Sequence, residues 1–205
     1  MKKVIIIISI ILFSIIGIIA YTIHRAYNFI QSPLNHIIIT VDSATNLKLE
    51  TASKESAGIL IDTSVILLTS KNKKIKLSKL LKSPPKLIFS FEYRNCNECI
   101  ERELNMLKAI SKDFKPDKII YLSNFENIRE QKIFEKDNEI EVLNLKNSRL
   151  GLPIEGLEYP FLFVVDTNYQ TIAVSPSVGL SLGLRPLYLQ TIILKYFHKR
   201  QTGGE

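Results

Sequence analysis

The chain has 205 residues, of which 46% are hydrophobic and 23% charged, and a formal net charge of +7. This length suits one folded domain with a short attachment, and the hydrophobic fraction is that of a protein with a packed core. The positive charge is densest at residues 71–82, KNKKIKLSKLLK, where no aromatic side chains alternate with the lysines. Because base stacking needs such aromatics, we interpret this stretch as a solvated hairpin and expect no nucleic-acid partner. Weak attraction to anionic lipid headgroups is the alternative.

The N-terminal segment is the most apolar part of the chain. Residues 4–20, VIIIISIILFSIIGIIA, contain no charge, and the apolar character continues to Ile23. About 20 apolar residues are enough for a helix to cross a bilayer. We therefore expect residues 4–23 to enter the lipid and residues 1–24 to form a cytoplasmic tip and a transmembrane anchor. The A-x-A pattern of a cleaved signal peptide is missing, which favours an uncleaved signal-anchor.

The charges beside this anchor indicate its orientation. Lys2 and Lys3 precede the apolar run, while Arg25 follows it closely. A positive excess on the N-terminal side predicts a cytoplasmic N-terminus. The expected location is therefore the cell membrane, crossed once, with the folded domain facing the periplasm or the cell exterior.

The rest of the chain divides into three parts. Residues 25–58 are expected to form a stalk and an edge hairpin, with short strands at 36–42 and 47–50. A folded domain is expected at 59–200 and a flexible tail at 201–205. Apolar and turn patterns predict these elements of the domain in chain order: a β-hairpin around the lysine-rich turn, a buried strand at 86–91, a helix from the cysteines to Phe114, a strand at 117–124, a helix at 128–138, strands at 139–145, 160–166 and 171–175, and a closing helix at 184–200.

This order of elements predicts an α/β fold. A strand–helix–strand unit followed by an antiparallel strand pair and a covering helix is typical of a central mixed β-sheet flanked by helices.

The two cysteines of the chain, Cys96 and Cys99, form a CxxC motif between the strand at 86–91 and the helix that follows. Cysteines at i and i+3 of a helical turn lie close enough for a reversible disulfide. Free N–H groups and the positive end of the helix dipole favour the thiolate of Cys96, while Cys99 points towards the buried face. The motif therefore predicts Cys96 as the attacking nucleophile and Cys99 as the resolving thiol.

The cysteines have two other possible interpretations. A structural zinc ion needs four ligands, and the histidines His24, His36 and His198 lie far from the single cysteine pair in the sequence. We therefore expect neither a metal ion nor an organic cofactor. A structural staple, or two incidental thiols, is the other interpretation, although so short a loop constrains little chain entropy.

The stretch KLIFSFEYRNCNEC, the helix after it and EYPFLFVVD downstream resemble the membrane-anchored thioredoxin-like thiol–disulfide oxidoreductases of the TlpA/ResA type. The resemblance covers about residues 60–198. It implies a thioredoxin-like sandwich, protein disulfides or thiols as substrates and a membrane thiol system as electron donor. It also implies a cis Tyr159–Pro160 bond that faces the CxxC motif and leaves backbone free to bind a substrate peptide. An ordinary trans proline that opens a strand is the alternative.

Four positions depart from the pattern of that family. Asn95 and Glu98 replace the usual aromatic residue and proline beside the cysteines, and Ser90 stands where thioredoxin buries an aspartate. Arg102 stands where TlpA-like proteins place a glutamate. The Glu98 carboxylate opposes the thiolate about as much as the helix terminus favours it, so we expect a reducing pair rather than a strong oxidant.

The sequence thus predicts an enzyme that exchanges disulfides with partner proteins outside the cytoplasm, while anchored in the membrane. Glu92 and Glu103 are candidate proton relays, with solvated surface carboxylates as the alternative interpretation of both. Peroxidase activity is not expected, because no threonine or proline precedes Cys96 at the usual spacing. The alternative function is a redox-inactive thioredoxin-fold binding module tethered to the membrane.

Overall fold

A computed structural model describes residues 42–94, 96–111, 118–178 and 184–197, together with Gly17 and Tyr21. The remainder of the expected anchor, residues 36–41 of the strand expected at 36–42, and the tail lie outside the described residues. None of the helices that the structure describes has both the length and the apolar character needed to cross a bilayer. Contacts divide the chain into Met1–Ile39 and Thr40–Glu205, and the second unit holds the folded domain.

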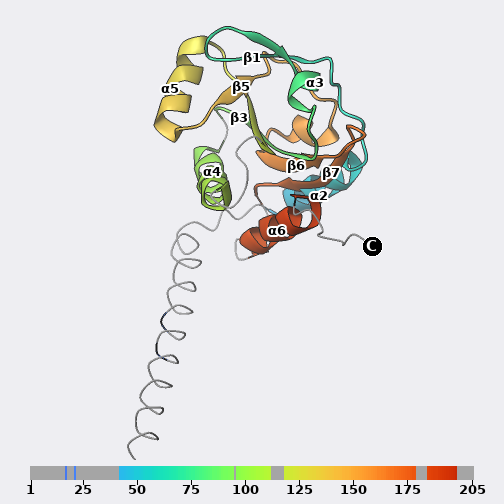
Figure 1. The fold of residues 1–205 in the computed structure, drawn as a ribbon. Helices are drawn as coiled ribbons and strands as arrows, with labels where there is room; N and C mark the ends of the chain where they lie inside the picture. Colours follow the sequence, from blue (N-terminus) through green and yellow to red (C-terminus); the bar gives the residue numbers. More distant parts are fainter. Residues whose placement is uncertain are drawn as a thin grey trace, which may run out of the picture. The chain divides into compact units, whose positions relative to one another are not determined.

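The described part of this domain is built around a seven-stranded mixed sheet with the order β2-β1-β5-β4-β3-β6-β7 (Figure 1). Strands β3, β4 and β5 run parallel to one another, and the other neighbours are antiparallel. The strands are β1 (Ile66–Leu68), β2 (Lys74–Lys76), β3 (Lys86–Glu92), β4 (Ile119–Asn124), β5 (Val142–Asn144), β6 (Phe161–Val165) and β7 (Thr171–Pro176).

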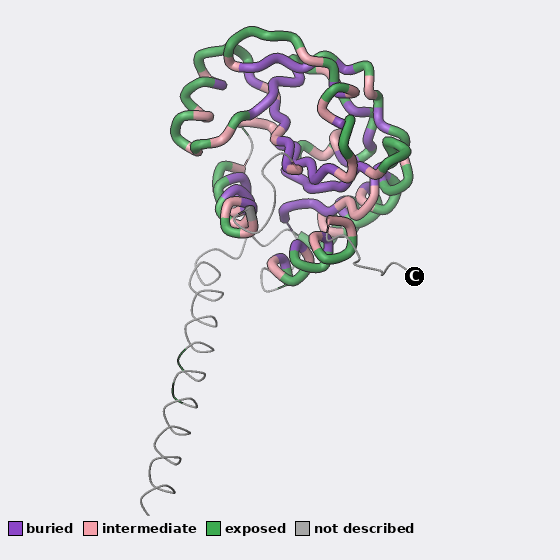
Figure 2. The backbone as a smooth tube through the Cα atoms, in the orientation of Figure 1, coloured by how far each residue is buried: buried purple, intermediate pink, exposed green. Residues whose placement is uncertain are grey.

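Helices cover both faces of the sheet. They are α2 (Ser43–Ser56), α3 (Leu77–Leu80), α4 (Asn97–Ser111), α5 (Ile128–Asn138), the 3-10 helix η2 (Pro153–Leu157), α6 (Arg185–Ile192) and the π-helical turn η4 (Ile193–Phe197). One core cluster joins the sheet to α4 and α6, and the other joins it to α2, α3 and η2. Figure 2 shows that buried backbone is concentrated in the central strands.

Strand β3 lies near the middle of the sheet and carries the chain to the cysteines. Its sequence, KLIFSFE, is buried at six of seven positions, because β4 and β6 pair with it on either side and helices cover both faces. Leu87 and Phe89 pack into the cluster beneath α4, while Ile88 packs into the cluster on the opposite face. The alternation of side chains along a strand thus joins the two cores through one segment.

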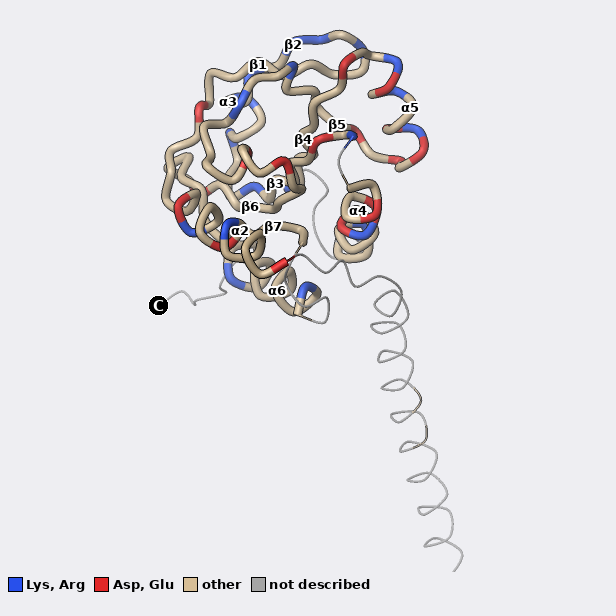
Figure 3. The backbone as a smooth tube through the Cα atoms, turned by 180° about the vertical axis from the view of Figure 1, so that it is seen from behind, with Lys and Arg blue, Asp and Glu red and all other residues tan. Residues whose placement is uncertain are grey.

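The lysine-rich hairpin is confirmed. Strands β1 and β2 pair antiparallel with Leu67 opposite Ile75, and every lysine of residues 71–82 is exposed. Figure 3 shows basic residues along β2, which is an edge strand of the sheet. Lysines on an edge strand hinder pairing with another chain, which gives this charge a protective role.

The prediction of an edge hairpin within residues 25–58 is wrong for its second half, because residues 43–56 form helix α2. The Asp42 carboxylate caps this helix by accepting the backbone N–H groups of Ala44 (3.0 Å) and Thr45 (2.9 Å). Leu49 and Ala52, three residues apart, are buried on one face. Asp42, which the sequence places at the end of an expected strand, is instead the Asx-type cap that starts this helix.

The other predicted elements agree closely with the structure. Helix α5 spans the predicted residues 128–138, and Asn127 caps it by accepting the N–H groups of Arg129 and Glu130 at 3.0 Å each. The predicted strand at 160–166 is β6. The closing helix at 184–200 is α6 followed by η4, up to the last residue that the structure describes there.

Candidate functional site

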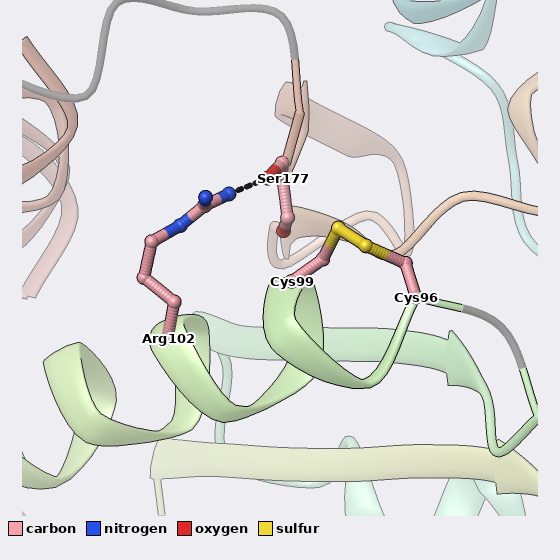
Figure 4. The surroundings of a disulfide bond; sticks show 4 residues. All are labelled: Cys96, Cys99, Arg102 and Ser177. Carbon is pink, nitrogen blue, oxygen red and sulfur yellow. Dashed lines mark hydrogen bonds between the residues drawn. A yellow bond between two sulfur atoms is a disulfide. The ribbon is translucent and has the colours of Figure 1, made fainter. Parts of the chain in front are cut away.

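The cysteine pair lies where β3 ends and α4 begins, and the two sulfurs are joined in a disulfide with a Cα–Cα distance of 5.2 Å (Figure 4). The Cys96 carbonyl accepts the backbone N–H of Cys99 (2.9 Å) and of Ile100 (3.1 Å), so Cys96 starts the helix. The predicted placement of the motif on a strand-to-helix junction is therefore confirmed.

The two cysteines differ in exposure. Cys99 is 0% exposed, while Cys96 is only partly buried. Cys96 is therefore the more accessible of the two sulfurs, while the order of attack stays a prediction. Cys96 also has a φ of 30°, in the left-handed region that disfavours residues with a Cβ atom. Such strained backbone is concentrated at functional sites, where the surrounding structure holds it in place.

Glu103 is 0% exposed, so the interpretation of this residue as a solvated surface carboxylate is wrong. Arg185 of α6 donates from Nε to both of its carboxylate oxygens at 3.1 Å, and the Nη2–Oε1 distance is 3.0 Å. A proton on Glu103 would leave the buried Arg185 charge without its partner. The relay role of Glu103 stays a prediction that this ion pair disfavours.

Arg185 anchors α6 to the rest of the site. Its Nη1 donates to Ser175 Oγ (2.6 Å) and its Nη2 donates to Ser177 Oγ (3.2 Å), both at the end of β7. The guanidinium carbon lies 5.1 Å from the ring centroid of Tyr188. Burial raises the pKa of Tyr188 to about 12, and its hydroxyl donates to the Ala173 carbonyl. This polar cluster therefore links α4, β7 and α6.

Glu92 lies at the end of β3 and accepts a hydrogen bond from Asn124 Nδ2 (2.7 Å). It lines a cavity of ≈ 360 Å³ together with Arg94, Arg149 and Tyr159, beside the carboxyl ends of the parallel strands. Ligands of open α/β sheets bind at such an edge. Neither cysteine lines this cavity, so the relay role of Glu92 stays a prediction.

The expected cis Tyr159–Pro160 bond is not found. Among the described residues, the cis peptide bond is Pro84–Pro85. The chain turns before β6 through Glu158, which ends η2 in the left-handed conformation with a φ of 58°. The Pro160 carbonyl then accepts the N–H of Ser177 at 2.7 Å. A trans proline thus opens β6, and substrate binding at Tyr159 and Pro160 stays a prediction.

Two arginines make tertiary contacts in this region that the sequence did not predict. Arg185 has no local signal, because its partner Glu103 lies 82 residues earlier in the chain. Arg102 donates from Nη2 to the Ser177 carbonyl (Figure 4). Partial burial lowers the pKa of the Arg102 guanidinium, while the Glu103 charge acts in the opposite direction. For Arg102, the available sequence signal was its position three residues after Cys99, which places both residues on one face of the helix.

Comparison with protein-family models gives no match, and comparison with curated proteins gives none either. Solved structures share the fold. A thioredoxin-like protein from Porphyromonas gingivalis matches with a TM-score of 0.51 and 21% identity, over 68% of this chain and 95% of that chain. A thiol:disulfide interchange protein from Bacteroides sp. matches with a TM-score of 0.52 and 14% identity, over 71% of this chain and 93% of that chain.

These similarities confirm the predicted fold class. The described domain has an α/β thioredoxin-like fold, with a mixed sheet flanked by helices and a CxxC pair at the start of α4. At such identities the comparison concerns the fold alone. Within the part of the chain that the structure describes, no group of three or more histidine, cysteine or acidic side chains has a metal-binding arrangement.

Proposed function

We propose that this chain is a membrane-anchored thiol–disulfide oxidoreductase that reduces disulfides of partner proteins outside the cytoplasm. The observation that carries the proposal is the contrast within the CxxC pair, where Cys96 is accessible and Cys99 is fully buried at the start of α4. One reachable sulfur and one protected sulfur are what a two-step exchange needs, because the partner meets a single nucleophile and the second thiol acts within the chain.

The reaction transfers two electrons to the partner. The Cys96 thiolate attacks one sulfur of the partner's disulfide, and the other partner sulfur leaves as a thiolate that takes up a proton. The Cys99 thiolate then attacks Cys96 Sγ, which breaks the mixed disulfide and forms the Cys96–Cys99 bond. The second partner sulfur leaves as a thiolate and is protonated. A dithiol of the membrane electron donor returns the pair to its reduced form.

A trapping experiment tests this reaction. We expect the Cys99→Ser chain, reduced and then mixed with a disulfide-containing protein such as insulin, to form a disulfide-linked adduct. Dithiothreitol is expected to cleave this adduct by reduction. The serine cannot attack Cys96 Sγ, so the mixed disulfide persists. The measurement is non-reducing electrophoresis of the full chain in detergent, followed by mass determination.

The matched control is Cys96→Ser, which keeps the buried thiol and is expected to form no adduct. Wild-type protein is expected to pass through a cooperative two-electron transition between about −220 and −300 mV in glutathione or dithiothreitol buffers. Absence of both the adduct and the 96–99 disulfide in oxidising buffer would refute the proposal and favour the redox-inactive binding module.

The anchored location is a separate part of the proposal and rests on the uncharged run at residues 4–20. We expect the chain to remain in the membrane fraction after alkaline carbonate washing. A membrane-impermeant maleimide, applied to intact cells after mild reduction, is expected to label Cys96. Labelling that occurs only after lysis would place the pair in the cytoplasm, where a redox-sensing role would replace the proposed one.

A further inference from the structure

The face of α4 that begins with Cys99 carries Arg102 one turn later. Residues at i and i+3 of a helix have Cβ atoms about 5–6 Å apart. Figure 4 shows both side chains rising from the same side of α4 towards Ser177. Ser177 is 3% exposed and lies at the end of β7, so this face is covered by the protein. The Arg102 cation and the buried sulfur of the pair are therefore carried by the same face of α4.

The position of the Arg102 head group is fixed by contacts. Its Nη2 donates to the Ser177 carbonyl. Ser177 is in turn held by its own N–H, which donates to the Pro160 carbonyl (2.7 Å), and by its Oγ, which accepts from Arg185 Nη2 (3.2 Å). The guanidinium is consequently oriented by β6, β7 and α6.

One buried hydrogen-bond donor of this head group lacks an acceptor. The Nε atom of Arg102 is buried and has no hydrogen-bond partner among the residues that the structure describes. A buried donor without an acceptor costs about 1–3 kcal/mol. Such groups in a native structure call for an explanation, of which a role in redox chemistry is one. In the oxidised pair Cys99 carries no charge, whereas in the reduced pair it can become an anion.

The other charged groups near Cys99 are either exposed or paired. On α4, Glu98 is exposed to solvent and Glu103 is paired with Arg185 of α6. The end of β7 contributes Ser175 and Ser177, which are uncharged, and Glu92 at the end of β3 accepts from Asn124. Arg102 forms no ion pair with any residue that the structure describes. The charges of Glu103, Arg185 and Glu98 act on its guanidinium without pairing with it, so this charge remains available to the sulfur.

We propose that Arg102 is the charge partner of Cys99, which stabilises the Cys99 thiolate in the reduced pair and so speeds resolution of the mixed disulfide. This inference rests on the proposed function. In the resolving step Cys99 gives its proton to solvent, its sulfur bonds to Cys96 Sγ, and the Cys96–partner bond breaks. The electron pair of that bond leaves with the partner sulfur, which is then protonated. Burial alone would oppose the Cys99 anion, and an adjacent cation offsets this.

The test measures the ionisation of Cys99 without a partner. In the full chain carrying Cys96→Ala, the ultraviolet absorbance of the thiolate is followed against pH. We expect Cys99 to titrate at or below about 8.5, the value of a free thiol, despite its burial. Arg102→Gln, which keeps an amide donor for Ser177, is expected to raise this pKa by about one unit, a tenfold loss of thiolate. Arg102→Lys, which keeps the charge, is expected to restore most of it.

Two results would overturn the assignment. One is a Cys99 pKa in the Cys96→Ala chain about two units above that of a free thiol, which needs no Arg102 variant to fold. The other is a Cys99 pKa that is the same in Arg102→Gln as in the chain with arginine at position 102. Because no partner protein enters this measurement, it is independent of the trapping experiment. If the trapping experiment yields no adduct but the Cys99 pKa rises in Arg102→Gln, then the assignment of Arg102 as charge partner stands and the proposed function fails.

Discussion

Replacing Glu103 with alanine is expected to lower the free energy of unfolding by about 3–5 kcal/mol, because it leaves the Arg185 charge buried without its partner. Glu103 is 0% exposed and Arg185 4% exposed, so solvent cannot take over the role of the carboxylate. The sequence has no tryptophan, so urea unfolding of the full chain is followed by circular dichroism. The change is expected in the midpoint, with little change in the denaturant slope.

An exposed ion pair provides the matched control. Glu50 and Lys54 lie one turn apart on α2 at 2.9 Å, with side chains 65% and 75% exposed. Glu50→Ala is expected to leave the urea midpoint almost unchanged, because solvent screens both charges. Removing both buried charges, with Glu103→Met and Arg185→Met together, is expected to recover much of the lost stability. Equal effects of Glu50→Ala and Glu103→Ala would show that the buried pair does not hold α6 in place.

The buried pair also explains how the helix after the cysteines is tied to the C-terminal part of the domain. Arg185 contacts Glu103 on α4 and the hydroxyls of Ser175 and Ser177 at the end of β7. The Ser177 carbonyl in turn holds Arg102, one turn after Cys99. The reactive end of α4 is therefore positioned by residues from the last quarter of the chain, as well as by β3.

The sequence was sufficient to predict those elements that have an apolar or capping pattern of their own. The segment KLIFSF is apolar at both faces and forms the central strand β3, and residues 128–138 form α5 with Asn127 as its cap. The CxxC motif at a strand-to-helix junction was likewise readable, because its geometry is set by one helical turn. These features depend on neighbours within a few residues.

Features that depend on residues far apart in the sequence were either not predicted or predicted wrongly. The Glu103–Arg185 pair spans 82 residues, and burial of Glu103 follows from packing of α6 that no local pattern indicates. The cis bond at Tyr159–Pro160 was inferred from family resemblance, whereas in this chain the left-handed Glu158 makes the turn. Helix α2 was read as a hairpin because its apolar face is narrow, with Leu49 and Ala52 as its buried apolar residues.

Phe89→Ala is expected to reduce the free energy of unfolding by about 3–5 kcal/mol, as is usual for a fully buried phenylalanine. Phe89 is 0% exposed and packs against Phe91 with ring centroids 5.0 Å apart. It belongs to the core cluster that contains Ile100 and Leu104 of α4. A cavity at this point removes packing from beneath the helix that buries Cys99, so the first turn of α4 is expected to open more often.

Phe163→Ala is the matched control, because Phe163 lies on the neighbouring strand, is also 0% exposed and packs into the cluster on the opposite face of the sheet. Its loss of stability is expected to be similar, at about 3–5 kcal/mol. Alkylation of the reduced protein distinguishes the two variants, with mass spectrometry resolving the cysteines. Under strongly native conditions Cys99 is expected to react several-fold faster in Phe89→Ala than in Phe163→Ala, because local opening of α4 exposes it before global unfolding does. Equal rates in two equally destabilised variants would mean that Cys99 becomes accessible through global unfolding, and that β3 does not control exposure of the resolving thiol.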